Sequence, residues 1–185
     1  MAPVPKPTPE ALRAAMNRTV PDLLAPGLRV LFCGINPSLY TAAVGYHFAR
    51  PGNRFWPALH ASGFTARRLD PSEQAEMLAA GLGLTNVVAR ATASADELSP
   101  EELARGGKRL RAKVRRYKPA FLAVLGVGAY RVAFGERDAQ LGPQPEALGD
   151  TRLWVLPNPS GLNAHYTLPS LTRLFRALRE AVERG

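Results

Sequence analysis

Four short segments made almost wholly of apolar residues constrain the fold of this chain most. They are Arg29–Gly34, Leu82–Val88, Pro119–Leu125 and Leu153–Leu156, and they alternate with stretches of helical periodicity. Strands that are apolar along their whole length are what a sheet covered on both faces requires. The chain is therefore predicted to be an α/β protein with three layers (αβα), in which helices cover both faces of a central, mostly parallel sheet.

Two helices carry clear boundary signals. Ser99 is followed by proline and two glutamates, a pattern typical of a helix N-terminus, and Pro119 ends the apolar stripe that follows. A second helix is predicted from about Pro169 to Arg184, with leucines and Phe175 on one side and arginines elsewhere. These helices are expected to pack on the sheet.

The 185 residues are predicted to form one domain, since single cores usually close at ~100–200 residues. Residues 1–10 hold four prolines and no apolar periodicity, which favours a flexible arm, and residues 11–185 are assigned to the folded domain. One short helix is expected within residues 9–26. A second core is not predicted.

The charge balance favours a polyanionic partner. The chain has 24 Lys and Arg against 15 Asp and Glu, a formal net charge of +9, which is typical of proteins that bind nucleic acid. Eight basic residues and no acidic ones lie between Arg105 and Lys118. Lys108 and Arg111 in this run are candidate contacts to the DNA backbone, although a solubility role explains the run equally well.

Several protein classes are excluded by what the sequence lacks. The single cysteine, Cys33, rules out a disulfide framework, an all-cysteine zinc site and an iron–sulfur cluster held by this chain alone. The three histidines have no metal-ligand spacing, so no metal is expected. No stretch approaches the ~18 apolar residues of a membrane span, and the start lacks the apolar core of a secretory signal. We expect a monomer in the cytoplasm, near the nucleoid if the source is bacterial.

Two chemically similar loops follow the first and the last apolar strand. One reads Gly34-Ile-Asn-Pro-Ser38 and the other Pro157-Asn-Pro-Ser-Gly-Leu162. Ligands of open α/β sheets bind outside the carboxyl ends of the strands, where both loops are predicted to lie. Proline narrows the backbone of the residue before it, so Asn36 and Asn158 can each aim an amide, one at a water and one at a carbonyl oxygen. Alternatively, Asn-Pro simply starts a turn after each strand.

The segment between Gly45 and Trp56 adds aromatic and basic residues to the first loop. Together with the two loops it resembles the uracil-DNA glycosylase superfamily, most closely its mismatch-specific branch, which includes Mug and thymine-DNA glycosylase. The resemblance rests on Gly34-Ile35-Asn36-Pro37, on Phe48 with Asn53-Arg54-Phe55-Trp56, and on Asn158-Pro159-Ser160-Gly161-Leu162. Less specifically, it extends from about Leu24 to the last helix.

This resemblance implies an enzyme that flips uracil, or thymine or another damaged base, out of duplex DNA with G:U or G:T mismatches. The enzyme then hydrolyses the N-glycosidic bond and leaves an abasic site, and the resemblance implies that no cofactor is required. Asn36 would position the water without taking its proton, and Asn158 would face the base oxygen on which charge accumulates. Base-binding roles fall to Ile35 through its backbone, to Phe48 through stacking, and to Ser38, which stands where a glycine is usual. A core aromatic is the other interpretation of Phe48.

The resemblance also implies a wedge that enters the duplex. Gly161 and Leu162 would fill the gap left by the flipped base, and the backbone of Asn163 would contact the partner base. Ser160 and His165 are the nearby candidates for contacts to the DNA backbone. Asn163-Ala164 replaces the basic continuation expected of the family. The alternative for Leu162 is an ordinary buried leucine.

One carboxylate is a candidate for the general base that Asn36 is not. Asp96 lies in the loop between the second apolar strand and Ser99, and from there it can reach the crevice. Alternatively, Asp96 supports the following helix or lies in solvent. No lysine occurs in either Asn-Pro loop, so a lyase step is not expected.

Two other function classes compete with the glycosylase. A basic α/β module that binds damaged or single-stranded nucleic acid without cleaving it is compatible with asparagine at the water position. A Rossmann-like nucleotide-binding enzyme rests only on Gly126-Val127-Gly128, for which tight strand-to-helix packing is an adequate explanation.

Overall fold

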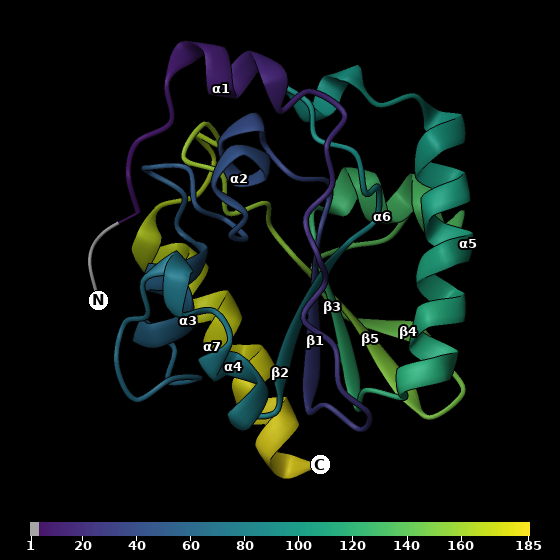
Figure 1. Cartoon of the computed structure of the whole chain (residues 1–185). Coiled ribbons are helices and arrows are strands. Elements are labelled where there is room, and N and C mark those ends of the chain that lie inside the picture. Colours follow the sequence, from purple (N-terminus) through teal and green to yellow (C-terminus); the bar gives the residue numbers. More distant parts are fainter. Residues whose placement is uncertain (1–3) are drawn as a thin grey trace.

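The computed structural model describes residues 4–185, and its centre is a single five-stranded sheet (Figure 1). The strands are β1 (Val30–Gly34), β2 (Leu82–Asn86), β3 (Phe121–Leu125), β4 (Gly142–Leu148) and β5 (Thr151–Leu156). Their order in the sheet is β2-β1-β3-β5-β4, with β4 antiparallel to β5 and all other neighbours parallel. The predicted mostly parallel sheet is confirmed, and four of its strands are the four apolar segments.

Helices cover both faces of this sheet, which confirms the predicted three layers. Figure 1 shows α3 (Phe55–Ala61), α4 (Glu76–Ala79) and α7 (Leu168–Arg184) on one side, and α5 (Pro100–Tyr117) and α6 (Val127–Phe134) on the other. Two short helices, α1 (Pro9–Ala14) and α2 (Leu39–Val44), lie beyond the carboxyl ends of the parallel strands. None of the helices within residues 4–185 is long and apolar enough to cross a membrane.

The strand β1 shows why the central segments are apolar throughout. Its Phe32 packs on one face of the sheet with Phe55, Phe64 and Phe175, while Cys33 packs on the other. Burying one such phenylalanine stabilises the fold by roughly 1.5–3 kcal/mol. Because β1 is buried on both faces, its side chains stabilise the packing of both helical layers on the sheet. Complete burial also raises the pKa of the Cys33 thiol, which therefore behaves as a small apolar side chain.

The long helix α5 begins as its sequence predicts. The Ser99 hydroxyl accepts a hydrogen bond from the backbone N–H of Glu102, and the Glu102 carboxylate accepts one from the N–H of Ser99. This reciprocal pair is the capping box. At the end of β3, Gly126 packs against the side chain of Ile35 as α6 begins, in agreement with tight strand-to-helix packing.

Two features differ from the sequence-based expectations. The strand β4 is not predicted, because Pro143 and Pro145 interrupt its seven residues. It lies at the sheet edge with alternating exposure, where proline is tolerated. The helix α1 confirms the short helix expected within residues 9–26, but it begins at Pro9 with Thr8 as its cap, inside the segment assigned to the arm. Residues 1–3 of that arm lie outside the described part of the chain.

Candidate active site

A cavity of about 330 Å³ opens at the carboxyl ends of the parallel strands. Gly34 of β1, Asn86 of β2 and Leu125 of β3 contribute to its wall, and so does Asn158, which follows β5. The crevice rule predicts this position. Nine candidate residues line it, namely Ile35, Asn36, Ser38, Phe48, Asp96, Asn158, Ser160, Leu162 and Asn163. Asn36 and Asn158, which are far apart in the chain, thus share one pocket.

The orientation of the Asn36 amide follows from its hydrogen bonds. Its Nδ2 donates to the carbonyl oxygen of Arg90 at 3.0 Å and to Oγ1 of Thr92 at 2.8 Å. A backbone carbonyl can only accept, so the NH2 end must point toward Arg90. Oδ1 of Asn36 accepts no hydrogen bond from residues 4–185, and its lone pairs are left for a group in the pocket.

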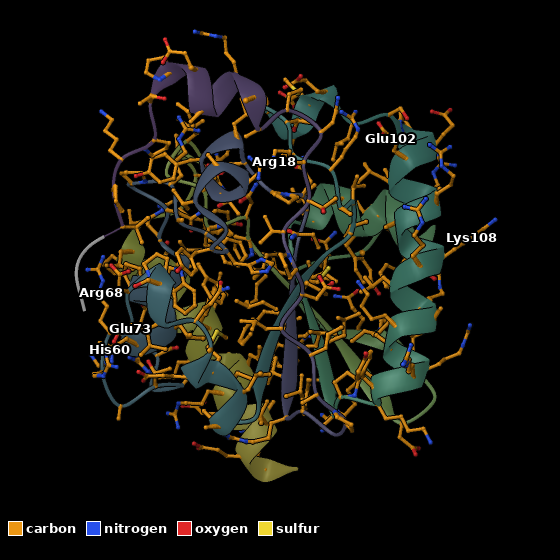
Figure 2. The ribbon with its side chains drawn as sticks, viewed as in Figure 1. Arg18, His60, Arg68, Glu73, Glu102 and Lys108 are labelled. Carbon is orange, nitrogen blue, oxygen red and sulfur yellow. The ribbon has the colours of Figure 1, made fainter. Side chains whose placement is uncertain are left out.

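The partners of Asn36 are themselves held in place. The Arg90 guanidinium donates to the Glu102 carboxylate, with Nε and Oε1 2.6 Å apart, and Thr92 Oγ1 donates to the carbonyl of Ser94 at 2.7 Å. The hydrogen bond from Arg90 lowers the pKa of Glu102 to about 2, so this carboxylate stays charged near neutral pH. Figure 2 shows Glu102 at the first turn of α5. The helix cap and the anchor of Asn36 are therefore one connected unit.

The Asn158 amide has the opposite arrangement. Its Oδ1 accepts a hydrogen bond from the backbone N–H of Ser160 at 3.0 Å, which directs the NH2 end away from the loop. Within residues 4–185, Nδ2 of Asn158 donates to no other group. The pocket thus receives a free acceptor from Asn36 and a free donor from Asn158.

The floor of the pocket is formed where Phe48 and Asn86 converge on Gly34. A Cβ atom at Gly34 would lie 2.6 Å from Oδ1 of Asn86 and 3.3 Å from Cζ of Phe48, so a larger residue would require these two side chains to shift. The Phe48 ring stacks on Phe55, with centroids 4.3 Å apart, and also lines the cavity. Phe48 therefore combines both interpretations, a core contact on one side and a pocket surface on the other.

The family model of the uracil DNA glycosylase superfamily matches residues 21–182. The chain belongs to this superfamily. Members of the superfamily are DNA glycosylases, hydrolases that act on DNA. Within residues 4–185, the structure contains no group of three or more His, Cys, Asp or Glu side chains that could hold a metal ion.

The loop that the family resemblance predicts to be a wedge has an apolar tip that is open to solvent. Leu162 is 74% exposed, so the alternative of an ordinary buried leucine is wrong. Its backbone N–H donates to Oγ of Ser160 at 3.2 Å. Next to it, a Cβ atom at Gly161 would lie 2.6 Å from the carbonyl oxygen of Gly52, so glycine lets the two loops touch.

Asn163 is already engaged in the free protein. Its backbone N–H donates to the carbonyl of Ser160 at 3.0 Å, and its own carbonyl accepts from the Arg54 guanidinium at 2.9 Å. Both backbone groups of Asn163 thus have partners within the protein, and the contact from Asn163 to a partner base stays a prediction. His165 is exposed and lies outside the pocket lining.

Arg111, a predicted contact to DNA, has its guanidinium turned toward the protein, and its contact to DNA stays a prediction. Its guanidinium lies 4.6 Å from the centre of the Phe134 ring and donates to the carbonyls of Ala133 and Phe134 at 3.4 Å. Arg111 thus covers the C-terminal end of α6. Lys108 lies outside the pocket lining, and Figure 2 shows it extending from α5 away from the body of the molecule.

Ser38 and Ile35 line the pocket and also accept hydrogen bonds that stabilise the surrounding backbone. Oγ of Ser38 accepts the backbone N–H of Thr41 at 3.1 Å and so caps α2, which explains a hydroxyl where the family pattern has glycine. The carbonyl of Ile35 accepts a hydrogen bond from Val88 at 2.9 Å. A base-edge contact through that carbonyl would have to share it with Val88.

Asp96 lines the pocket from the short 3-10 turn Ala95–Glu97 and is exposed. It does not support the following helix, since Ser99 caps α5. Its carboxylate forms no hydrogen bond or ion pair within residues 4–185. The position is compatible with activating a water.

Asn86 and His47 are among the pocket residues that were not predicted. Asn86 ends β2 with no side-chain hydrogen bond among the described residues, and the crevice rule applied to that strand could have found it. His47 is buried, with Nε2 2.8 Å from the carbonyl of Pro21, and burial lowers its pKa, so its imidazole is neutral at pH 7. An isolated histidine in a loop gives no sequence signal for this position.

Proposed function

We propose that this protein is a mismatch-specific, monofunctional DNA glycosylase that releases uracil from G:U pairs and leaves an abasic site. Thymine in G:T pairs is the second candidate substrate. The observation that carries the proposal is the pair of oppositely oriented amides, Asn36 and Asn158, on one pocket. Hydrolysis of a glycosidic bond needs one group to hold a water and another to stabilise the departing base.

The proposed chemistry follows from the two amide atoms without a hydrogen-bond partner among residues 4–185, Oδ1 of Asn36 and Nδ2 of Asn158. The bond between C1′ and the base nitrogen breaks, its electron pair leaves with the base, and the water oxygen bonds to C1′. The attacking water gives up one proton to the surrounding solvent, and the released base anion takes one up from solvent. Oδ1 of Asn36 accepts a hydrogen bond from the water, and Nδ2 of Asn158 donates to the base oxygen on which negative charge grows. An amide cannot take the water's proton, so Asn36 forgoes the ~10²–10⁴-fold that a general base typically adds.

The base would lie between aromatic and amide surfaces. Stacking on Phe48 is worth roughly 1–3 kcal/mol, and Asn86 offers both a donor and an acceptor to the base edge. Leu162 would enter the duplex in place of the flipped base, and a mismatched pair is the easiest to open. Preference for mispairs follows because opening a mismatched pair costs less free energy than opening a matched pair.

The decisive experiment is incubation with a G:U duplex followed by alkali. We expect strand scission at the uracil with the wild-type protein and none with a U-free duplex. Tight binding of G:U DNA without scission would contradict the proposal and support a non-catalytic binding module. A panel with U and T opposite each base then ranks the mispairs.

Asp96→Asn tests whether this carboxylate activates water. Because Asp96 is exposed, we expect a loss of about tenfold in single-turnover uracil release, below the ~10²–10⁴ range typical of general bases. Binding of the G:U duplex should not weaken. Asp150→Asn, at the exposed turn before β5, is the matched control. Equal release by the Asp96 variant and wild type would remove Asp96 from the mechanism.

The outer face of α5 is proposed as a sequence-independent contact to DNA phosphates. Five exposed cations follow helical spacing there: Arg105, Lys108, Arg109, Arg115 and Arg116. None of them forms an ion pair within residues 4–185. This face includes the predicted Lys108, whereas the guanidinium of Arg111 packs on Phe134.

Replacing Lys108 and Arg109 with glutamine should make DNA binding less dependent on salt. Each lost phosphate contact reduces the slope of log K against log[salt] by about 0.9, so we expect a change of about 1.8. Arg137 and Arg184, both exposed and outside the pocket lining, give the matched double variant. If the slopes of both variants equal that of wild type, the α5 face serves solubility only.

A further inference from the structure

We propose that Arg54 is a positioning residue that holds the wedge loop, residues 159–166, in the shape that presents Leu162 to DNA. The inference rests on the proposed function, since it assigns to Leu162 the displacement of a base. Arg54 comes directly before α3 and is more than a hundred positions from the loop in sequence. No sequence signal other than its place in the Asn53–Trp56 block singled it out.

Arg54 binds the wedge loop from its first residue to its last. Its backbone N–H donates to the carbonyl of Pro159 at 2.9 Å. Its NH2 group donates to the carbonyls of Ser160 at 2.7 Å and Asn163 at 2.9 Å, and its NH1 group donates to that of Tyr166. Four points along one loop are thus tied to a single residue.

The guanidinium of Arg54 is charged, but its contact with the wedge loop includes no carboxylate. Arg54 forms no ion pair within residues 4–185, so its charge is met by carbonyl oxygens, which make strong charge-assisted bonds. Its Nε is buried without a hydrogen-bond partner. A planar fork can reach three carbonyls at once, which the single ammonium of lysine cannot do in the same geometry.

Leu162 depends on the hydrogen bonds of Arg54 because few side chains pack against it. Its side chain is 74% exposed, so its direction is set by the backbone of the loop and not by neighbouring side chains. Asn158 directly precedes the loop, and its carbonyl accepts a hydrogen bond from Nδ2 of Asn163 at 3.1 Å. Arg54 therefore fixes the wedge relative to the pocket that would receive the flipped base.

The first test compares a paired uracil with an unpaired one. Arg54→Met should slow single-turnover release from a G:U duplex by about tenfold, because extrusion needs the wedge. Release of uracil opposite an abasic-site analogue, where no base has to be displaced, should change much less. Arg184→Met, on the last turn of α7, is the matched control and should behave as wild type on both substrates.

The second test is a double-mutant cycle on the G:U duplex. If Arg54 acts through Leu162, the variant carrying both Arg54→Met and Leu162→Ala should be no slower than Leu162→Ala alone. Arg54→Lys keeps the positive charge but not the planar guanidinium, and it should release uracil at about the same rate as Arg54→Met. Should Arg54→Met fail to fold in a thermal melt, the lysine variant carries the same cycle.

Additive losses in the cycle would overturn the proposal, as would an equal loss on both substrates. A wild-type protein that releases uracil from neither substrate would instead overturn the proposed function. The two failures are therefore distinguishable. Non-additive losses confined to the paired substrate would establish Arg54 as the brace of the wedge.

Discussion

Asn158→Ala should lower single-turnover release of uracil by about 10²–10³-fold, the usual effect of removing one donor to a developing anion. Nδ2 of Asn158 is the end of this amide left free, because Oδ1 is occupied by the N–H of Ser160. The donor acts on charge that forms only as the bond breaks. Affinity for a duplex carrying non-hydrolysable 2′-fluoro-deoxyuridine should therefore change little.

Asn158→Asp is the sharper variant at this position. A carboxylate can still accept the hydrogen bond from Ser160, so the loop keeps its shape, but its second oxygen would repel the departing base. We expect it to be at least as slow as the alanine variant. A rate close to wild type would show that stabilisation of the anion does not depend on Nδ2.

The second large effect is expected from Asn36→Ala. Without Oδ1 the attacking water loses its fixed position, and a misplacement of about 1 Å can reduce a rate by about 10²-fold. The protein should remain folded and bind the 2′-fluoro duplex. Quench measurements with enzyme in excess over a G:U duplex give the rate directly. An unchanged rate would mean that another group positions the water.

Thr92→Val provides a graded control for Asn36. It removes the Oγ1 that accepts Nδ2 of Asn36 but leaves the carbonyl of Arg90 as the second partner. The amide should become less well fixed, and the rate should fall between those of wild type and Asn36→Ala. Equal rates for the two variants would indicate that Thr92 alone holds the amide.

The layers of the fold could be predicted because strands that are buried on both faces consist almost wholly of apolar residues. A strand such as Val30–Gly34, buried at every position, needs apolar residues at every position. The strand β4 does not have this composition, since half of it faces solvent and two of its residues are proline. Its place at the edge depends on pairing with β5, which is a tertiary property.

The site was predictable in position but not in orientation. Parallel strands bring their carboxyl ends together, so two loops that follow such strands must meet, and Asn36 and Asn158 do. Which end of each amide faces the pocket depends on Arg90 and Ser160, whose placement no local pattern reveals. Likewise, Arg111 resembles any other cation of α5 until Phe134 is seen beneath it.

The prolines of β4 have a consequence for the behaviour of the whole molecule. At the open margin of a sheet, unpaired N–H groups invite a strand from another molecule, and aggregation begins there. Pro143 and Pro145 supply no N–H at all, and both are exposed at this margin. We therefore expect this edge to hinder two copies of the protein from pairing strand to strand.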